Sequence, residues 1–154
     1  MSLTRRFDVF ADYFQFYVCD AAYTTDTASL WVPETVDRML ATGPDLLGVG
    51  TARNMLVPVE LQVLDREPSP DPDDWDGMLD CGLSLHSGAL IVFGCTEEPA
   101  EAERIPVPAG DYGARVSCAG LDTLSEDGLD GDDRYRIQLW PGGVRPVMVV
   151  KPLG

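Results

Sequence analysis

The sequence has little of what most enzymes and metal sites require. Histidine occurs once, and the four cysteines, Cys19, Cys81, Cys95 and Cys118, form no C-x-x-C pair. A zinc site needs about four clustered nitrogen or sulfur ligands, which this spacing does not offer. The G-x-G-x-x-G, P-loop and G-x-S-x-G motifs are absent as well. The sequence therefore predicts no catalytic residue, no resident metal and no cofactor.

Basic residues are scarce and no apolar run is long. Eleven basic residues face 26 acidic ones, which gives a net charge of −15. This charge repels phosphate backbones and anionic lipids, so direct binding to nucleic acid or membranes is disfavoured. Asp8 and Asp12 interrupt the apolar stretch that follows Arg5 and Arg6, unlike in a signal peptide. We expect a cytoplasmic protein with free thiols.

What the sequence has in abundance is alternation of apolar and polar residues with a period of two. It occurs at 57–63, 79–85, 112–118 and 135–139, and less regular apolar runs occupy 7–10, 13–19, 46–51, 89–93 and 147–150. Such alternation is typical of antiparallel strands with one buried face. Together with the chain length and frequent turn signals, it predicts one mostly-β domain over residues 1–154. Its expected architecture is an antiparallel β-sandwich of about nine or ten strands.

Two local features refine this prediction. A short helix of about ten residues should begin at Pro33 and stop near Gly43. Its expected apolar face consists of Val36, Met39 and Leu40. Pro58 lies inside one alternating segment, and because proline cannot donate to a β-ladder, that strand should be an edge strand or carry a bulge.

Acidic residues are concentrated outside the predicted strands. Sixteen of the 26 lie in three segments, 65–76, 97–103 and 122–133. Loops on a rigid scaffold often carry binding sites, and they also carry charge that only keeps a protein soluble. On the binding interpretation, the partner is a basic protein. The predicted contact residues are Asp71, Asp73, Asp74, Asp76, Glu126, Asp127, Asp130, Asp132, Asp133, Arg53 and Asn54.

Other interpretations of the same residues stay open. Arg53 and Asn54 also fit a plain turn, with Asn54 in the left-handed region and Arg53 paired to a nearby acid. The acids and glycines of 127–132 suit calcium chemistry, but their spacing does not match an EF-hand. A Cys–His nucleophile would have to use His86, and a carboxylate pair acting as acid and base is a further option. The aromatic residues Tyr13, Phe14, Phe16, Tyr17 and Trp31 suit a core more often than a groove.

The order of several short motifs resembles the competence protein J family, described as inhibitors of a DNA-entry nuclease. The motifs are the aromatic strand Tyr13–Phe16, Trp31 with the helix after it, the glycine-containing strand that ends in Arg53–Asn54, and the turn segment Ile105–Tyr112. The resemblance spans roughly residues 12–120, and the tracts 65–76 and 121–133 depart from the family pattern. It implies a similar fold and an inhibitor of a nuclease, which agrees with a basic partner. The alternative function is a calcium- or small-ligand-binding sandwich module.

Overall fold

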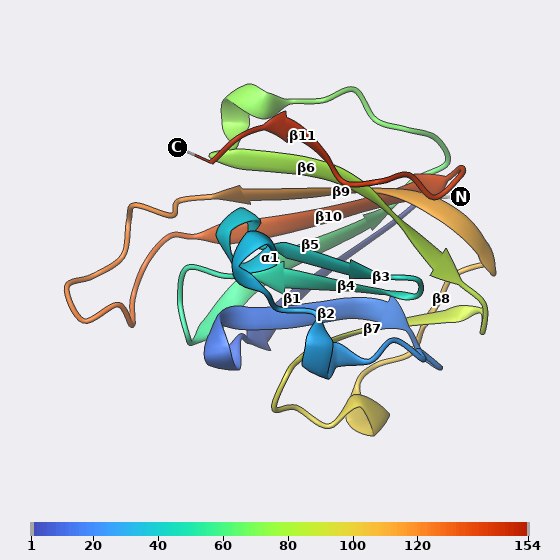
Figure 1. The fold of residues 1–154 in the computed structure, drawn as a ribbon, viewed down its shortest axis with the longest axis horizontal. Coiled ribbons are helices and arrows are strands. Elements are labelled where there is room, and N and C mark those ends of the chain that lie inside the picture. Colours follow the sequence, from blue (N-terminus) through green and yellow to red (C-terminus); the bar gives the residue numbers. More distant parts are fainter. Residues whose placement is uncertain (1, 154) are drawn as a thin grey trace.

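The fold consists of two β-sheets packed face to face, seen in a computed structural model that describes residues 2–153 (Figure 1). The larger sheet has six strands in the order β1-β5-β10-β9-β6-β11. Their bounds are β1 Leu3–Phe10, β5 Leu56–Val63, β6 Gly77–Leu85, β9 Gly110–Ala119, β10 Arg134–Pro141 and β11 Met148–Lys151. Most neighbours pair antiparallel, so the predicted mostly-β sandwich is confirmed.

The smaller sheet has five strands in the order β3-β4-β2-β7-β8. These are β2 Gln15–Asp20, β3 Leu40–Gly43, β4 Leu46–Gly50, β7 Ala89–Gly94 and β8 Ile105–Pro106. The helical elements are short: α1 Pro33–Arg38 and the 3-10 turns η1 Asp12–Phe14, η2 Thr27–Ser29, η3 Pro72–Asp74 and η4 Pro99–Glu101. Within residues 2–153, no helix is long and apolar enough to cross a membrane.

The period-two alternation places one face of each sheet in a shared core. In β5, and in β10 from Tyr135 to Leu139, the odd-numbered residues are buried, and they share one core with Phe16, Val18 and Leu47 of the smaller sheet. The Phe16 and Tyr135 rings contact edge to face across the two layers, with centroids 6.0 Å apart. Burial of this apolar surface, at roughly 25 cal/mol per Å², is the main stabilising contribution to the fold.

Two details of the sheets differ from the sequence-based prediction. β5 is an interior strand that pairs with β1 on one side and, in parallel, with β10 on the other, so the edge assignment of Pro58 is wrong. The β10 ladder begins only at Val59, opposite Tyr135, and Pro58 therefore lies just beyond it. The short strands β3 and β8 carry too few alternating residues to show a period, and the sequence analysis missed both.

The helix is shorter than expected. α1 ends at Arg38 because Met39 takes a left-handed conformation, with φ 61°, and Leu40 already begins β3. Val36 is 55% exposed, so its assignment to an apolar buried face is wrong. The predicted strand at 13–19 also begins later, because residues 12–14 form η1 and extended backbone starts only at Gln15.

Candidate functional site

The first acidic segment crosses the outer face of the larger sheet as a strap, which we define as residues 64–76. Under the strap, Arg115 of β9 is 1% exposed, and its Nε and Nη2 donate to the two carboxylate oxygens of Asp80 at 2.8 and 3.1 Å. Arg115 Nη1 also donates to the Pro68 carbonyl, which anchors the strap itself. Bidentate arginine–carboxylate pairs have a fixed geometry, so this contact orders the segment.

One of the predicted contact residues is neutralised within the strap. Arg136 of β10 donates to both oxygens of Asp71, at 2.9 and 2.6 Å. The Arg136 guanidinium holds the pKa of Asp71 below its ordinary value. Asp71 therefore offers little free charge to a partner, and its interaction is with the molecule's own sheet.

Trp75 fixes the end of the strap. Trp75 is 5% exposed, and the guanidinium groups of Arg134 and Arg136 lie 4.0 and 4.5 Å from its ring centroid. Lys151 donates from Nζ to the carbonyls of Pro72 and Trp75. The backbone between these anchors carries Asp73 and Asp74, whose side chains are exposed.

The third acidic segment forms the loop between β9 and β10, residues 120–133, and it meets the strap. The Asp76 backbone N–H donates to the Cys118 carbonyl, and the Asp76 carboxylate accepts from the Leu121 N–H at 3.1 Å. Farther along, Asp127 accepts from the Ser125 hydroxyl and the Leu129 N–H, so it shapes the turn of its own loop. The two acidic segments therefore converge at one end of the larger sheet.

A buried ion pair closes the base of this loop. Asp133 is 0% exposed and accepts from Arg53 Nε at one oxygen and from the Tyr135 hydroxyl, at 2.7 Å, at the other. The Tyr135 hydroxyl in turn accepts from the Ala52 N–H at 2.7 Å, and Arg53 Nη1 donates to the Leu129 carbonyl. Arg53 and Asp133 thus face each other inside the protein and hold the loop against the β4–β5 connection.

The plain-turn interpretation predicted that Arg53 pairs with a nearby acid, and the pair with Asp133 confirms this part of it. The left-handed conformation predicted for Asn54 is wrong, because among the described non-glycine residues positive φ occurs at Tyr13, Phe14 and Met39. The Asn54 side-chain oxygen is buried without a hydrogen-bond partner within the described residues. Which acid pairs with Arg53 was not readable from the sequence, because Arg53 and Asp133 are 80 residues apart.

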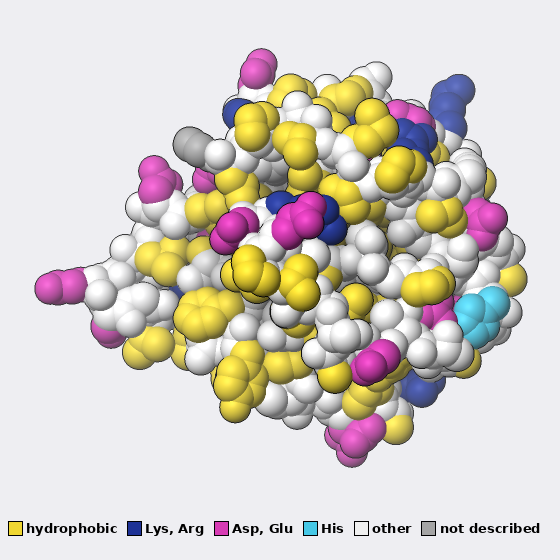
Figure 2. Space-filling view, in the orientation of Figure 1, with side chains coloured by type: hydrophobic (Ala, Val, Ile, Leu, Met, Phe, Trp, Pro, Cys, Tyr) yellow, Lys and Arg dark blue, Asp and Glu magenta, His cyan; other side chains and the backbone are white. Residues whose placement is uncertain are grey.

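The exposed carboxylates of these two segments that form no ion pair make up one surface, which we call the acidic corner. Within residues 2–153, none of its members forms an ion pair with a basic side chain, and all are exposed. They are Asp73, Asp74, Asp76, Asp122, Glu126, Asp127, Asp130 and Asp132. Figure 2 shows acidic side chains on the projecting β9–β10 loop, at the left end of the molecule, and near η3, at its top.

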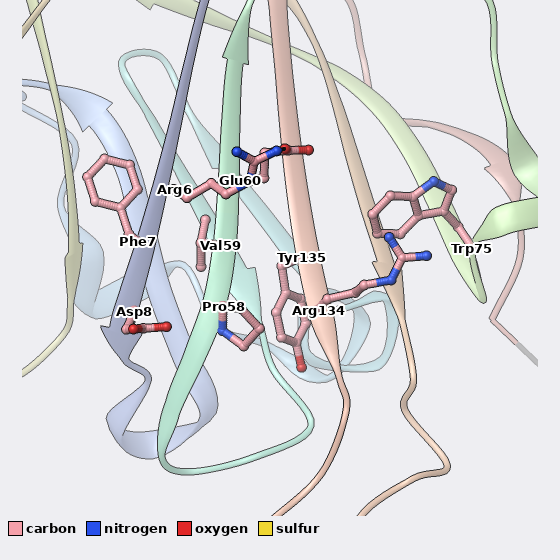
Figure 3. A pocket seen from close by; sticks show the side chains of 9 residues that line it. All are labelled: Arg6, Phe7, Asp8, Pro58, Val59, Glu60, Trp75, Arg134 and Tyr135. Atoms are coloured by element: carbon pink, nitrogen blue, oxygen red, sulfur yellow. Dashed lines mark hydrogen bonds and ion pairs between the residues drawn. The ribbon is translucent and has the colours of Figure 1, made fainter.

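A shallow pocket of about 370 Å³ lies beside the acidic corner on the outer face of the larger sheet (Figure 3). Arg6 and Asp8 of β1 and Glu60 of β5 line one side, and Arg134 with Trp75 lines the other. Arg6 is paired with Glu60 at 2.7 Å. Charges of both signs and an aromatic edge suit recognition of a partner's side chains.

The nucleophiles considered from the sequence are far from reactive. Burial raises the pKa of the Cys81 thiol to about 12 and that of Cys118 to about 11, and it also raises the pKa values of Cys95 and Cys19. A thiol with such a pKa is protonated at neutral pH and is a poor nucleophile. All four cysteines are free. In the described part of the chain, no group of three His, Cys, Asp or Glu side chains is arranged to hold a metal ion.

His86 has carboxylates as neighbours. Its Nε2 is 3.1 Å from an Asp45 oxygen and 3.5 Å from an Asp20 oxygen, and both aspartates are buried. Asp20 accepts from the Ser87 hydroxyl and from the backbone N–H groups of residues 22, 86 and 87, while Asp45 ties residues 24 and 25 to the β3–β4 turn. Both carboxylates are used in structure, at the end of the sandwich opposite the acidic corner.

This cluster predicts a loss of stability in acid. Burial raises the pKa of Asp45, but hydrogen bonds from Thr25, Thr24 and His86 outweigh it and hold that pKa well below its ordinary value. Stability from a depressed carboxyl pKa is present above the unfolded pKa of about 3.9 and is lost as the pH falls through the folded pKa. We expect the free energy of unfolding to fall below about pH 4, and less steeply in Asp45→Asn. Urea titrations at several pH values measure both slopes, and equal slopes would contradict the assignment.

No family model matches the chain, and no curated protein matches its sequence. Two solved structures resemble its fold. One is ComJ from Bacillus subtilis, described as an inhibitor of the DNA degrading activity of NucA, with a TM-score of 0.70 and 14% identity over 92% of this chain and 99% of that one. The other is described as crocagin biosynthetic gene J, with a TM-score of 0.61 and 18% identity over 92% of this chain and 98% of that one. The resemblance to the competence protein J family is thereby confirmed at the level of fold.

Proposed function

We propose that this chain is a non-enzymatic, cytoplasmic inhibitor that binds a basic DNA-degrading nuclease through its acidic corner. The observation that carries the proposal is the acidic corner itself, because its carboxylates lack internal ion pairs while Arg53, Arg115 and Arg136 are paired with other carboxylates. The similarity in fold to ComJ, which is described as inhibiting a nuclease, supports it.

A nuclease surface complements such free carboxylates. An enzyme that cleaves DNA binds a polyanion, so the surface around its active site is cationic. A protein surface that holds free carboxylates in fixed positions competes with DNA for the same basic side chains of the nuclease. The Arg53–Asp133 pair and the Arg115–Asp80 pair hold that frame before binding, which lowers the entropic cost of association.

The alternative of a calcium-binding module has no comparable support. Asp127, the central acid of its candidate loop, already uses one oxygen for the Ser125 hydroxyl and the Leu129 N–H. The eight carboxylates of the acidic corner fit the proposed interaction with a cationic surface without requiring a metal.

We expect the purified chain to slow DNA cleavage by NucA, or by the DNA-degrading nuclease purified from the cells that make it. The inhibition should be competitive with DNA and should weaken roughly tenfold or more as salt rises from about 0.05 M to about 0.5 M. A fluorescent DNA-degradation assay measures both effects. The control is ovalbumin, an unrelated acidic protein, at equal concentration. It shows whether any acidic protein slows the cleavage. Inhibition of neither nuclease would overturn the proposal.

A further inference from the structure

The connection between β1 and β2 carries backbone strain at two consecutive aromatic residues. Tyr13 has φ 56° and Phe14 has φ 62°, a left-handed region that side chains with a Cβ rarely adopt. Both side chains are exposed to solvent, by 69% and 53%. A strained backbone that presents two large aromatic rings to water is the opposite of what stability alone favours.

This turn shares its frame with the acidic corner. The Phe14 carbonyl accepts from the Thr51 N–H at 2.9 Å, and the next residue, Ala52, donates to the Tyr135 hydroxyl that also binds Asp133. The β4–β5 connection therefore ties the aromatic turn to the base of the β9–β10 loop. Figure 1 places η1 and that loop at the same end of the sandwich, and Figure 2 shows hydrophobic side chains there, directly beside the acidic ones.

We propose that Tyr13 and Phe14 are the aromatic anchor of the interface with the nuclease, and this inference rests on the function proposed above. Both rings insert into an apolar pocket at the margin of the nuclease's cationic cleft. Interfaces commonly combine a buried aromatic centre, which slows dissociation, with surrounding charges that speed association. Here the acidic corner supplies the charge, and the strained turn holds both rings outward before the partner arrives.

Glycine substitution separates this role from a purely structural one. Glycine adopts positive φ without penalty, so Tyr13→Gly and Phe14→Gly should melt at an unchanged or higher temperature than the wild type. Each should nevertheless weaken binding to the inhibited nuclease by about 30-fold or more, mainly through faster dissociation. Val144→Ala, in the connection between β10 and β11 and 51% exposed, is the control and should bind like the wild type.

Surface plasmon resonance with immobilised nuclease, NucA first, gives both rate constants, and calorimetry gives the melting temperature. Glycine variants that bind as tightly as the wild type would overturn the anchor while leaving the acidic corner intact. If a glycine variant fails to fold, Tyr13→Asn and Phe14→Asn take its place, because asparagine tolerates the left-handed region. Absence of wild-type binding and inhibition with either nuclease would overturn the proposed function and, with it, the anchor.

Discussion

Asp133→Ala is expected to lower the free energy of unfolding by about 3 to 5 kcal/mol. The Asp133 side chain is fully buried and is the common acceptor for Arg53 Nε and the Tyr135 hydroxyl. Its removal leaves Arg53, whose side chain is only 10% exposed, without its counter-charge. Breaking one partner of a buried pair costs much more than the pair contributes, because the remaining charge stays desolvated. Chemical denaturation monitored by tryptophan fluorescence measures the change.

Asp132→Ala is the matched control for this prediction. Asp132 is the preceding residue, its side chain is exposed, and no hydrogen bond or ion pair of its carboxylate exists within the described residues. Its substitution should therefore change stability by no more than about 0.5 kcal/mol. Arg53→Ala should resemble Asp133→Ala, and the double variant should lose less than the sum, since both single changes break one interaction. Equal stability of the variants at 132 and 133 would show that the buried pair does not hold the loop.

The strands with strict alternation were predictable from the sequence alone. In β5, β6, β9 and β10 the apolar residues recur at every second position, and burial of one face follows directly from that period. The order of strands was not predictable in the same way. The parallel pairing of β5 with β10 joins residues such as Val59 and Tyr135, far apart in the chain, and no local pattern encodes it.

The candidate site was predictable in composition but not in geometry. The clustering of acids in 65–76 and 122–133 identified the two segments. Within them, Asp73 and Asp132 form no ion pair in the described part of the chain, whereas Asp71 and Asp133, from the same runs, do. The difference comes from Arg136 and Arg53, whose positions opposite those two acids are set by the tertiary structure. Tyr13 and Phe14 were assigned to a strand because they begin the apolar run 13–19, and their left-handed backbone has no signature in residue type.

Removing three charges from the acidic corner is expected to slow association with the nuclease by about tenfold or more at low salt. The variant combines Glu126→Gln, Asp130→Asn and Asp132→Asn. These three carboxylates make no hydrogen bond or ion pair within residues 2–153, so the fold loses no contact. The dissociation rate should change much less, because exposed charges at an interface act chiefly on the diffusional encounter. Stopped-flow or surface plasmon resonance kinetics across a salt series gives the two rates.

A second variant shows whether the position of the removed charges or the total net charge determines the association rate. Glu34→Gln, Asp37→Asn and Glu101→Gln also remove three of the negative charges that make up the net −15, but from α1 and η4. If the acidic corner is the contact surface, this variant should associate nearly as fast as the wild type at physiological salt, where the corner variant should still be slower, since charges beyond a Debye length of about 8 Å are screened there. Equal slowing by both variants would mean that overall charge attracts the nuclease. The free carboxylates at 126, 130 and 132 would then serve solubility, and the contact would lie on another face.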